Sequence, residues 1–112
     1  MDSGRNGGPA RVFGAFSDPT RLRLLALLRR GELCVCDLVS ILRIPQGTAS
    51  RHMSRLKAAG LVRSRDQGYW TYYSLAPARN RFHRSLLRCL DACVRDDATL
   101  RADARRRGTR CC

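Results

Sequence analysis

Residues 32–62 of this chain read ELCVCDLVSILRIPQGTASRHMSRLKAAGLV, and their pattern decides the fold. The apolar residues of its first part recur at helical spacing: Leu33, Leu38, Ile41 and Leu42. This pattern predicts a short helix that contains or begins at the two cysteines. Arg43-Ile44-Pro45 interrupts this helix, and Gln46 opens another that runs to about Ala59. Two short helices joined by a tight turn predict a helix-turn-helix.

The flanking segments extend this prediction in both directions. On the amino-terminal side we expect a short helix over residues 9–16, and then a leucine-rich core helix over 19–29 that starts at Ser17-Asp18-Pro19. On the other side, residues 61–65 and 69–75 are rich in β-branched and aromatic side chains, which predicts a β-hairpin. The predicted fold is therefore mainly α with a β-hairpin, a winged helix-turn-helix.

The rest of the chain suggests a dimer with a tail. Residues 77–100 predict a last helix with more apolar surface than a small domain needs for itself, so we expect a homodimer formed through the first and last helices. We assign residues 1–8 to a disordered N-terminus, 9–100 to one DNA-binding and dimerisation domain, and 101–112 to a basic tail that ends in Cys111 and Cys112.

The charge of the chain indicates a polyanionic partner. There are 22 Lys and Arg against 9 Asp and Glu, a formal net charge of +13 among 112 residues. Almost all of the cations are Arg, which suits contacts with phosphate and guanine edges. We therefore expect double-stranded DNA as the partner. The candidate DNA-contacting residues lie on the second helix of the helix-turn-helix and on the hairpin: Gln46, Thr48, Ser50, Arg51, His52, Arg55, Arg63 and Arg65.

The cysteines are expected to be reduced thiols. No apolar run approaches the roughly 18 residues that a membrane span needs, and the N-terminus does not resemble a signal sequence, so we expect a cytoplasmic protein without a membrane partner. In that compartment the six cysteines are expected to be metal ligands or redox sensors rather than a disulfide framework.

With its elements in this order, the chain resembles the ArsR/SmtB family of bacterial metal-responsive and metalloid-responsive repressors. The resemblance covers Leu22 to Leu75. It rests on the motifs ELCVCDL at 32–38, SRH at 50–52, AGLV at 59–62 and GYWTYYSL at 68–75. It implies a transcriptional repressor that binds an inverted-repeat operator as a dimer. Such a repressor releases the operator when a toxic ion occupies cysteine thiolates.

The cysteines and histidines that this chain offers restrict which ion the resemblance implies as inducer. Family members with a Cys-x-Cys-Asp motif before the recognition helix sense trivalent arsenic and antimony, or cadmium and lead. The cadmium and lead sensors add N-terminal cysteines, and residues 1–33 here contain none. Zinc, nickel and cobalt members use Asp and His on the last helix, which offers only His83 here. Trivalent arsenic or antimony, bound by Cys34 and Cys36, is the expected inducer of an arsenic resistance operon.

The third arsenic ligand is open at this point. The best-known arsenical repressors carry a cysteine three residues after the second one, where this chain has Val39. Trivalent arsenic prefers three sulfur ligands, so either another thiol completes the site or the inducer is an organoarsenical that needs two. Cys111 or Cys112 could reach in from the tail, while Cys89 and Cys93 on the last helix are weaker candidates.

The spacing of the cysteine pair also predicts how induction works. Residues i and i+2 of an α-helix point about 200° apart, so Cys34 and Cys36 cannot both bind one ion within a regular helix. In an extended backbone they face the same side. We therefore expect ion binding to unwind the start of this helix.

Two other functions are compatible with parts of the sequence. A repressor of the same fold could sense cadmium or lead, or could be a redox sensor whose thiols oxidise. An enzyme is not expected, because the chain has no Cys-x-x-Cys, no phosphate-binding cysteine loop and no strand-helix alternation.

Overall fold

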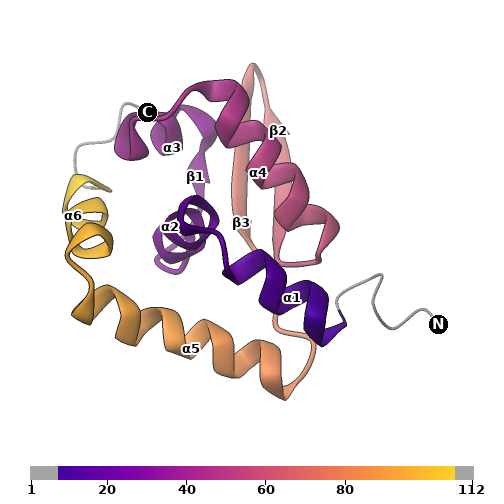
Figure 1. The fold of residues 1–112 in the computed structure, drawn as a ribbon. Helices are drawn as coiled ribbons and strands as arrows, with labels where there is room; N and C mark the ends of the chain where they lie inside the picture. The colour runs from indigo at the N-terminus through magenta and orange to yellow at the C-terminus, as the bar shows by residue number, and fades with distance from the viewer. Residues whose placement is uncertain (1–7, 108–112) are drawn as a thin grey trace.

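The computed structural model describes residues 8–107, which form a group of packed helices with a small antiparallel sheet at one side (Figure 1). The helix-turn-helix and the hairpin occupy the predicted positions, so the fold is the expected winged helix. The elements in chain order are α1 (Pro9–Phe16), α2 (Pro19–Leu28), β1 (Leu33–Cys34), α3 (Val35–Leu42), α4 (Gln46–Ala58), β2 (Val62–Gln67), β3 (Trp70–Leu75), α5 (Arg81–Asp96) and α6 (Ala98–Arg106).

Helix α2 forms the centre of the core. Asp18 caps its start by accepting a hydrogen bond from the Arg21 N–H, and Leu24 and Leu25 are fully buried. The helix contacts α1, α4, α5, α6 and β3. Around it the core collects apolar side chains from both halves of the helix-turn-helix, from the sheet and from α5: Leu33, Leu38, Ile41, Met53, Leu56, Leu61, Leu87 and Leu90. One helix thus supports both the helix-turn-helix and the C-terminal helices.

The sheet has the strand order β1-β3-β2, with all neighbours antiparallel. Strands β2 and β3 form the wing, whose tip turns at Gly68 in the left-handed region (φ 63°). Strand β1 was not predicted. Its two residues pair with the middle of β3, Leu33 opposite Tyr73 and Cys34 opposite Tyr72. The segment just before the helix-turn-helix is therefore part of the wing sheet.

The C-terminal part differs from the single helix predicted for residues 77–100. It is two helices, separated at Asp97, whose side chain caps α6 by accepting a hydrogen bond from the Leu100 N–H. Helix α6 extends to Arg106, so residues 101–106, assigned above to the tail, are helical. Residues 1–7 and 108–112, with Cys111 and Cys112, lie outside the described part of the chain.

Within residues 8–107, none of the helices has both the length and the apolar character that crossing a lipid bilayer requires.

Candidate functional site

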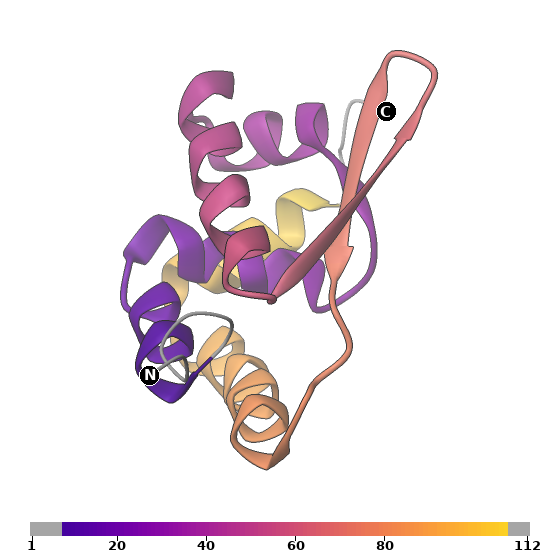
Figure 2. The same ribbon diagram turned by 90° about the vertical axis from the view of Figure 1, so that its right-hand side faces the viewer.

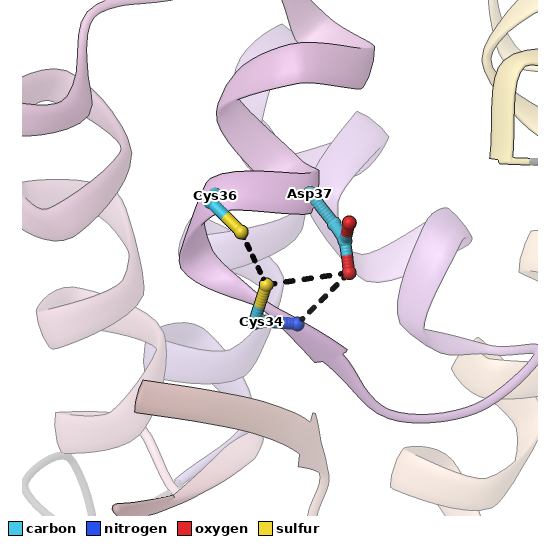
Figure 3. Close-up of side chains that lie close together, drawn as sticks. All are labelled: Cys34, Cys36 and Asp37. Carbon is cyan, nitrogen blue, oxygen red and sulfur yellow. Dashed lines mark hydrogen bonds between the residues drawn. The ribbon is translucent and has the colours of Figure 1, made fainter. Parts of the chain in front are cut away.

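The two motif cysteines converge on one point at the start of α3 (Figure 3). Cys34 is the last residue of β1 and the N-cap of α3, with an extended backbone (φ −82°, ψ 162°), while Cys36 lies in the first turn of the helix. Their Sγ atoms are 2.6 Å apart, and Asp37 Oδ2 lies 3.4 Å from the Cys34 sulfur. Among residues 8–107, this is the one group of three metal-binding side chains with its ligand atoms close together.

This geometry corrects the expected unwinding of the helix. The 200° separation applies only if both residues are helical, and Cys34 lies outside the helix. The β1–β3 pairing holds Cys34 extended, so that its thiol points toward that of Cys36. Two sulfur ligands are therefore brought together without disruption of α3.

Asp37 organises the start of α3. Its carboxylate accepts a hydrogen bond from the Cys34 N–H at 3.4 Å, which completes a capping box in which a cysteine replaces the usual serine or threonine. Asp37 is buried, as Cys34 is. Burial raises the pKa of the Cys34 thiol, and the neighbouring Asp37 carboxylate adds to this shift. Cys34 is therefore held as a protonated thiol at neutral pH.

The thiol site is joined to the wing by two connections. One is the backbone pairing of Cys34 with Tyr72 on β3. The other is an ion pair between Glu32 and Arg65 on β2, in which Nε and Nη2 donate to the two carboxylate oxygens at 2.8 and 2.7 Å. The Arg65 guanidinium also lies 4.6 Å from the centre of the Tyr72 ring. Residues 32–34 are thus bonded to both wing strands, Cys34 to β3 and Glu32 to β2.

The candidate DNA-contacting residues of α4 fall into two groups. Gln46, Arg51 and Arg55 are exposed, and Thr48 and Ser50 are half-buried at the start of the helix. His52 instead faces α2, with Nδ1 3.5 Å from Arg21 Nη1. Burial lowers the pKa of His52, and the neighbouring arginines add to the shift. This helix therefore presents a polar face flanked by arginines, with a neutral His52 at its inner edge.

The two wing arginines also differ. Arg63 is exposed on β2, whereas the donors of Arg65 are occupied by Glu32 and by Gln67. Sequence reasoning assigned both to DNA. In this structure Arg65 ties the wing to the residues that precede Cys34, and Arg63 is the wing arginine presented outward.

The cysteines of α5 are not close to the motif pair. Cys89 is exposed, and Cys93 lines a cavity of about 270 Å³ between α2 and the junction of α5 with α6. His83 is buried, and its Nδ1 accepts the Arg79 N–H at 3.2 Å. These residues form no third-ligand position for Cys34 and Cys36 in the described part of the chain.

Sequence reasoning missed a buried carboxylate on α6. Asp103 accepts two hydrogen bonds from Arg23 of α2, at 2.8 and 2.9 Å, and a third from Arg106 at 2.8 Å. Arg106 Nε also donates to the Ile41 carbonyl of α3 at 2.9 Å. We call Asp103, Arg23 and Arg106 the α6 latch. The signal in the sequence was that Asp103 is the single acidic residue among the arginines of 101–110 and precedes Arg106 by three positions.

Comparison with known proteins gives a consistent result. Residues 18–64 match the sequence profile described as "Bacterial regulatory protein, arsR family". The chain is 44% identical over 70 residues to the arsenical resistance operon repressor of Escherichia coli. That match covers 62% of this chain and 60% of the relative. It is 45% identical over 67 residues to a cadmium resistance regulatory protein CadC homolog of Staphylococcus aureus, a match that covers 59% of this chain and 55% of the relative.

Solved structures resemble most of the fold. The crystal structure of a fragment of a possible transcriptional regulatory protein from Mycobacterium bovis is 32% identical, with a TM-score of 0.63, covering 79% of this chain and 90% of that chain. A solution structure of the same fragment is 29% identical, with a TM-score of 0.64 and 80% of each chain covered. It is described as the homodimeric winged helix-turn-helix DNA-binding domain of a possible ArsR-family regulator.

Proposed function

Because the chain belongs to the ArsR family of bacterial regulatory proteins, whose members are DNA-binding transcriptional regulators rather than enzymes, we propose that it represses an arsenic or antimony resistance operon. The family profile over residues 18–64, the arsenical resistance repressor among its relatives and the winged-helix structures it resembles support a role as a repressor. In this proposal, trivalent arsenic or antimony binds Cys34 and Cys36 and releases the operator.

The observation that carries this proposal is the convergence of two thiols beside the DNA-reading elements. Soft thiolate ligands select soft ions, and the Cys34 and Cys36 sulfurs meet on the same side of the first turn of α3. The same residues connect to the wing through β1 and through Glu32. A bound ion changes the position of residues 32–36, and the wing and α4 move with them. The ion can lower operator affinity by at most the ratio of its own affinities for the DNA-free and the DNA-bound conformations.

The protonated state of Cys34 favours a metalloid hydroxide over a metal cation. Arsenous acid, As(OH)₃, exchanges hydroxyl groups for thiols: each S–H proton leaves with one hydroxyl as water, and an As–S bond replaces an As–O bond. A cadmium or lead cation instead drives the proton into solution, which is unfavourable for a thiol with a raised pKa. This difference supports arsenite or antimonite as the inducer in this proposal.

The operator is an inverted repeat read by a homodimer in this proposal. The apolar surface that α1 and α5 leave exposed supports a dimer through these helices, because Phe13 is 54% exposed and stacks on Phe82 with ring centroids 6.3 Å apart. Each protomer then places α4 in a major groove and Arg63 near the backbone. The DNA-contacting set is Gln46, Thr48, Ser50, Arg51, Arg55 and Arg63, with His52 and Arg65 at its edge.

A mobility-shift titration tests the proposal directly. Reduced protein bound to operator DNA should release it on addition of arsenite or antimonite, and the variant with both Cys34→Ser and Cys36→Ser should stay bound at every inducer concentration. The variant with Cys89→Ser and Cys93→Ser is the matched control and should respond as the native chain does. Release of the double motif variant by arsenite would show that the inducer binds elsewhere. Release by peroxide alone would assign the thiols to redox sensing instead.

The pH dependence of binding separates a metalloid from a metal cation. Since the pKa of Cys34 is raised, this thiol stays protonated through neutral pH, and cadmium binding must release its proton. Cadmium affinity should therefore rise about tenfold per pH unit for each proton released between pH 6 and 8. Arsenite affinity should stay nearly constant over this range, because water carries the protons away. Calorimetric or fluorescence titrations at three pH values measure both slopes. An equal pH dependence for cadmium and arsenite affinity would contradict this distinction between the two ions.

A further inference from the structure

The turn of the wing carries two large aromatic side chains that the rest of the protomer leaves exposed. Tyr69 is fully exposed (103%), and Trp70 is 49% exposed. Among residues 8–107, the other exposed large apolar side chain is Phe13, which stacks on Phe82. An aromatic ring in water gains free energy when a partner covers it. Residues 66–70, which we call the wing tip, are therefore a candidate contact surface.

The wing tip extends beyond the part of the sheet that the domain supports. Strand β1 pairs with Tyr72 and Tyr73 of β3, so residues 66–71 form a ribbon of two strands. The two-residue turn at the end of this ribbon consists of Gly68 and Tyr69. In Figure 2 this turn projects past the helices. The aromatic rings are thus presented where a partner can reach them.

The wing tip lies level with the amino-terminal end of α4. The chain turns at Gly60 (φ 79°), and β2 runs back along the helix, with Lys57 Nζ donating to Ser64 Oγ at 2.7 Å. The 13 residues of α4 rise about 20 Å, and the six residues of β2 span about the same length. Both views place the start of α4 and the wing tip at one end of the molecule, with α5 at the other (Figures 1 and 2). A duplex that binds α4 therefore also meets the wing tip.

The chemistry of the wing tip does not suit a phosphate. Its one charged side chain is the carboxylate of Asp66, which repels phosphate oxygens. Arg65 precedes the tip, but its guanidinium donates to Glu32 and Gln67. What the tip offers is two aromatic rings, one with a hydroxyl and one with an indole N–H. Such rings suit the sugar and base edges that line the minor groove of DNA.

We infer that Tyr69 and Trp70 enter the minor groove of operator DNA beside the major groove that α4 occupies, and that their rings pack on deoxyribose and base edges. The minor groove is about 6 Å wide, which admits a ring but not the whole ribbon. This contact adds affinity that does not depend on phosphate charge, unlike that of Arg63. The inference rests on the proposed function for the operator, and it adds two residues of a different chemistry to the DNA-contacting set.

Chemical footprinting tests the inference on a duplex that the native chain selects from a randomised pool of DNA. Hydroxyl radicals attack deoxyribose from the minor groove, whereas dimethyl sulfate modifies guanine N7 in the major groove. Tyr69→Ala should lose hydroxyl-radical protection beside each half-site and keep the guanine protection of the native chain. Unchanged hydroxyl-radical protection in this variant would overturn the inference alone. If the native chain selects no duplex, the proposed function itself fails.

The salt dependence of affinity separates this contact from a phosphate contact. Tyr69→Ala should bind the selected duplex about tenfold more weakly, with the salt dependence of the native chain. Tyr69→Phe keeps the ring and should restore most of the lost affinity. Arg63→Ala should both weaken binding and make the salt dependence shallower. Native affinity of Tyr69→Ala, or a shallower salt dependence in that variant, would contradict the assignment.

Trp70 is the only tryptophan of the chain, so its emission reports directly on the wing tip. Binding of the selected duplex should shield Trp70 from acrylamide, a neutral quencher, in proportion to the DNA bound. A tryptophan that stays equally quenchable in the saturated complex would overturn the inference. Shielding that rises with protein concentration in the absence of DNA would show that a second copy covers the tip, and would overturn it as well.

Discussion

Asp103→Asn should lower the free energy of unfolding by about 3 kcal/mol, which is the expected loss when one partner of a buried ion pair is removed. The carboxylate is 1% exposed and accepts three hydrogen bonds from Arg23 and Arg106. An asparagine at this position directs its amide protons at guanidinium groups and leaves the Arg23 charge uncompensated. Small domains have total stabilities of about 5–15 kcal/mol, so this single change removes a large part of that stability.

Denaturant titration and thermal unfolding at matched protein concentration measure the effect, with an expected fall in Tm of about 12 °C or more. Asp91→Asn is the control, because Asp91 also pairs with an arginine, Arg29, but its side chain is 45% exposed. That variant should lose less than about 1 kcal/mol. Equal losses in the two variants would show that burial of Asp103 does not strengthen the latch.

Arg51→Glu should lower operator affinity by about a hundredfold, because it puts an anion in place of a cation on the exposed face of α4 that the proposed function turns toward DNA. The affinity of the native chain should fall steeply with salt, as expected when arginines displace counterions from phosphates. The variant should also show a shallower salt dependence. Fluorescence anisotropy with labelled operator at three salt concentrations measures both quantities.

Arg105→Glu makes the same change of net charge on the exposed surface of α6 and should alter affinity by less than about fivefold. A comparable loss in both variants would mean that net charge alone, rather than the face of α4, governs binding. Circular dichroism of both variants excludes a loss of folding as the cause.

The helix-turn-helix and the wing were predictable because each has a local signal. Pro45 and Gly60 delimit α4, and the aromatic and β-branched residues of 69–75 have the composition of a strand. Strand β1 has no such signal, since two residues cannot establish a period and its pairing partner lies almost forty positions later. The split between α5 and α6 was missed because Asp97, which caps the second helix, lies inside a continuous run of helix-compatible residues.

The sequence singled out Cys34 and Cys36 as candidate ligands, but it did not predict how closely their sulfurs lie. The spacing of Cys34 and Cys36 indicated a soft-ion site. If both residues were helical, however, their side chains would point away from each other. What brings them together is the pairing of Cys34 with Tyr72, a contact between distant segments. The ion pair of Glu32 with Arg65 has the same origin, which is why Arg65 was assigned to DNA alone. Local patterns identify elements, whereas tertiary pairing determines how side chains meet.

The position of Cys34 at the N-cap of α3 has an evolutionary consequence. Oxygen-bearing side chains are the preferred caps at such positions, and a cysteine is not among them. A single-base change from cysteine to serine therefore supplies a better cap and, under the proposed function, removes a ligand of the inducer. The proposal then predicts that variants which repress permanently arise without loss of fold stability. In that case the fold does not protect this thiol against drift, and recurrent exposure to the inducer is what retains it in a population.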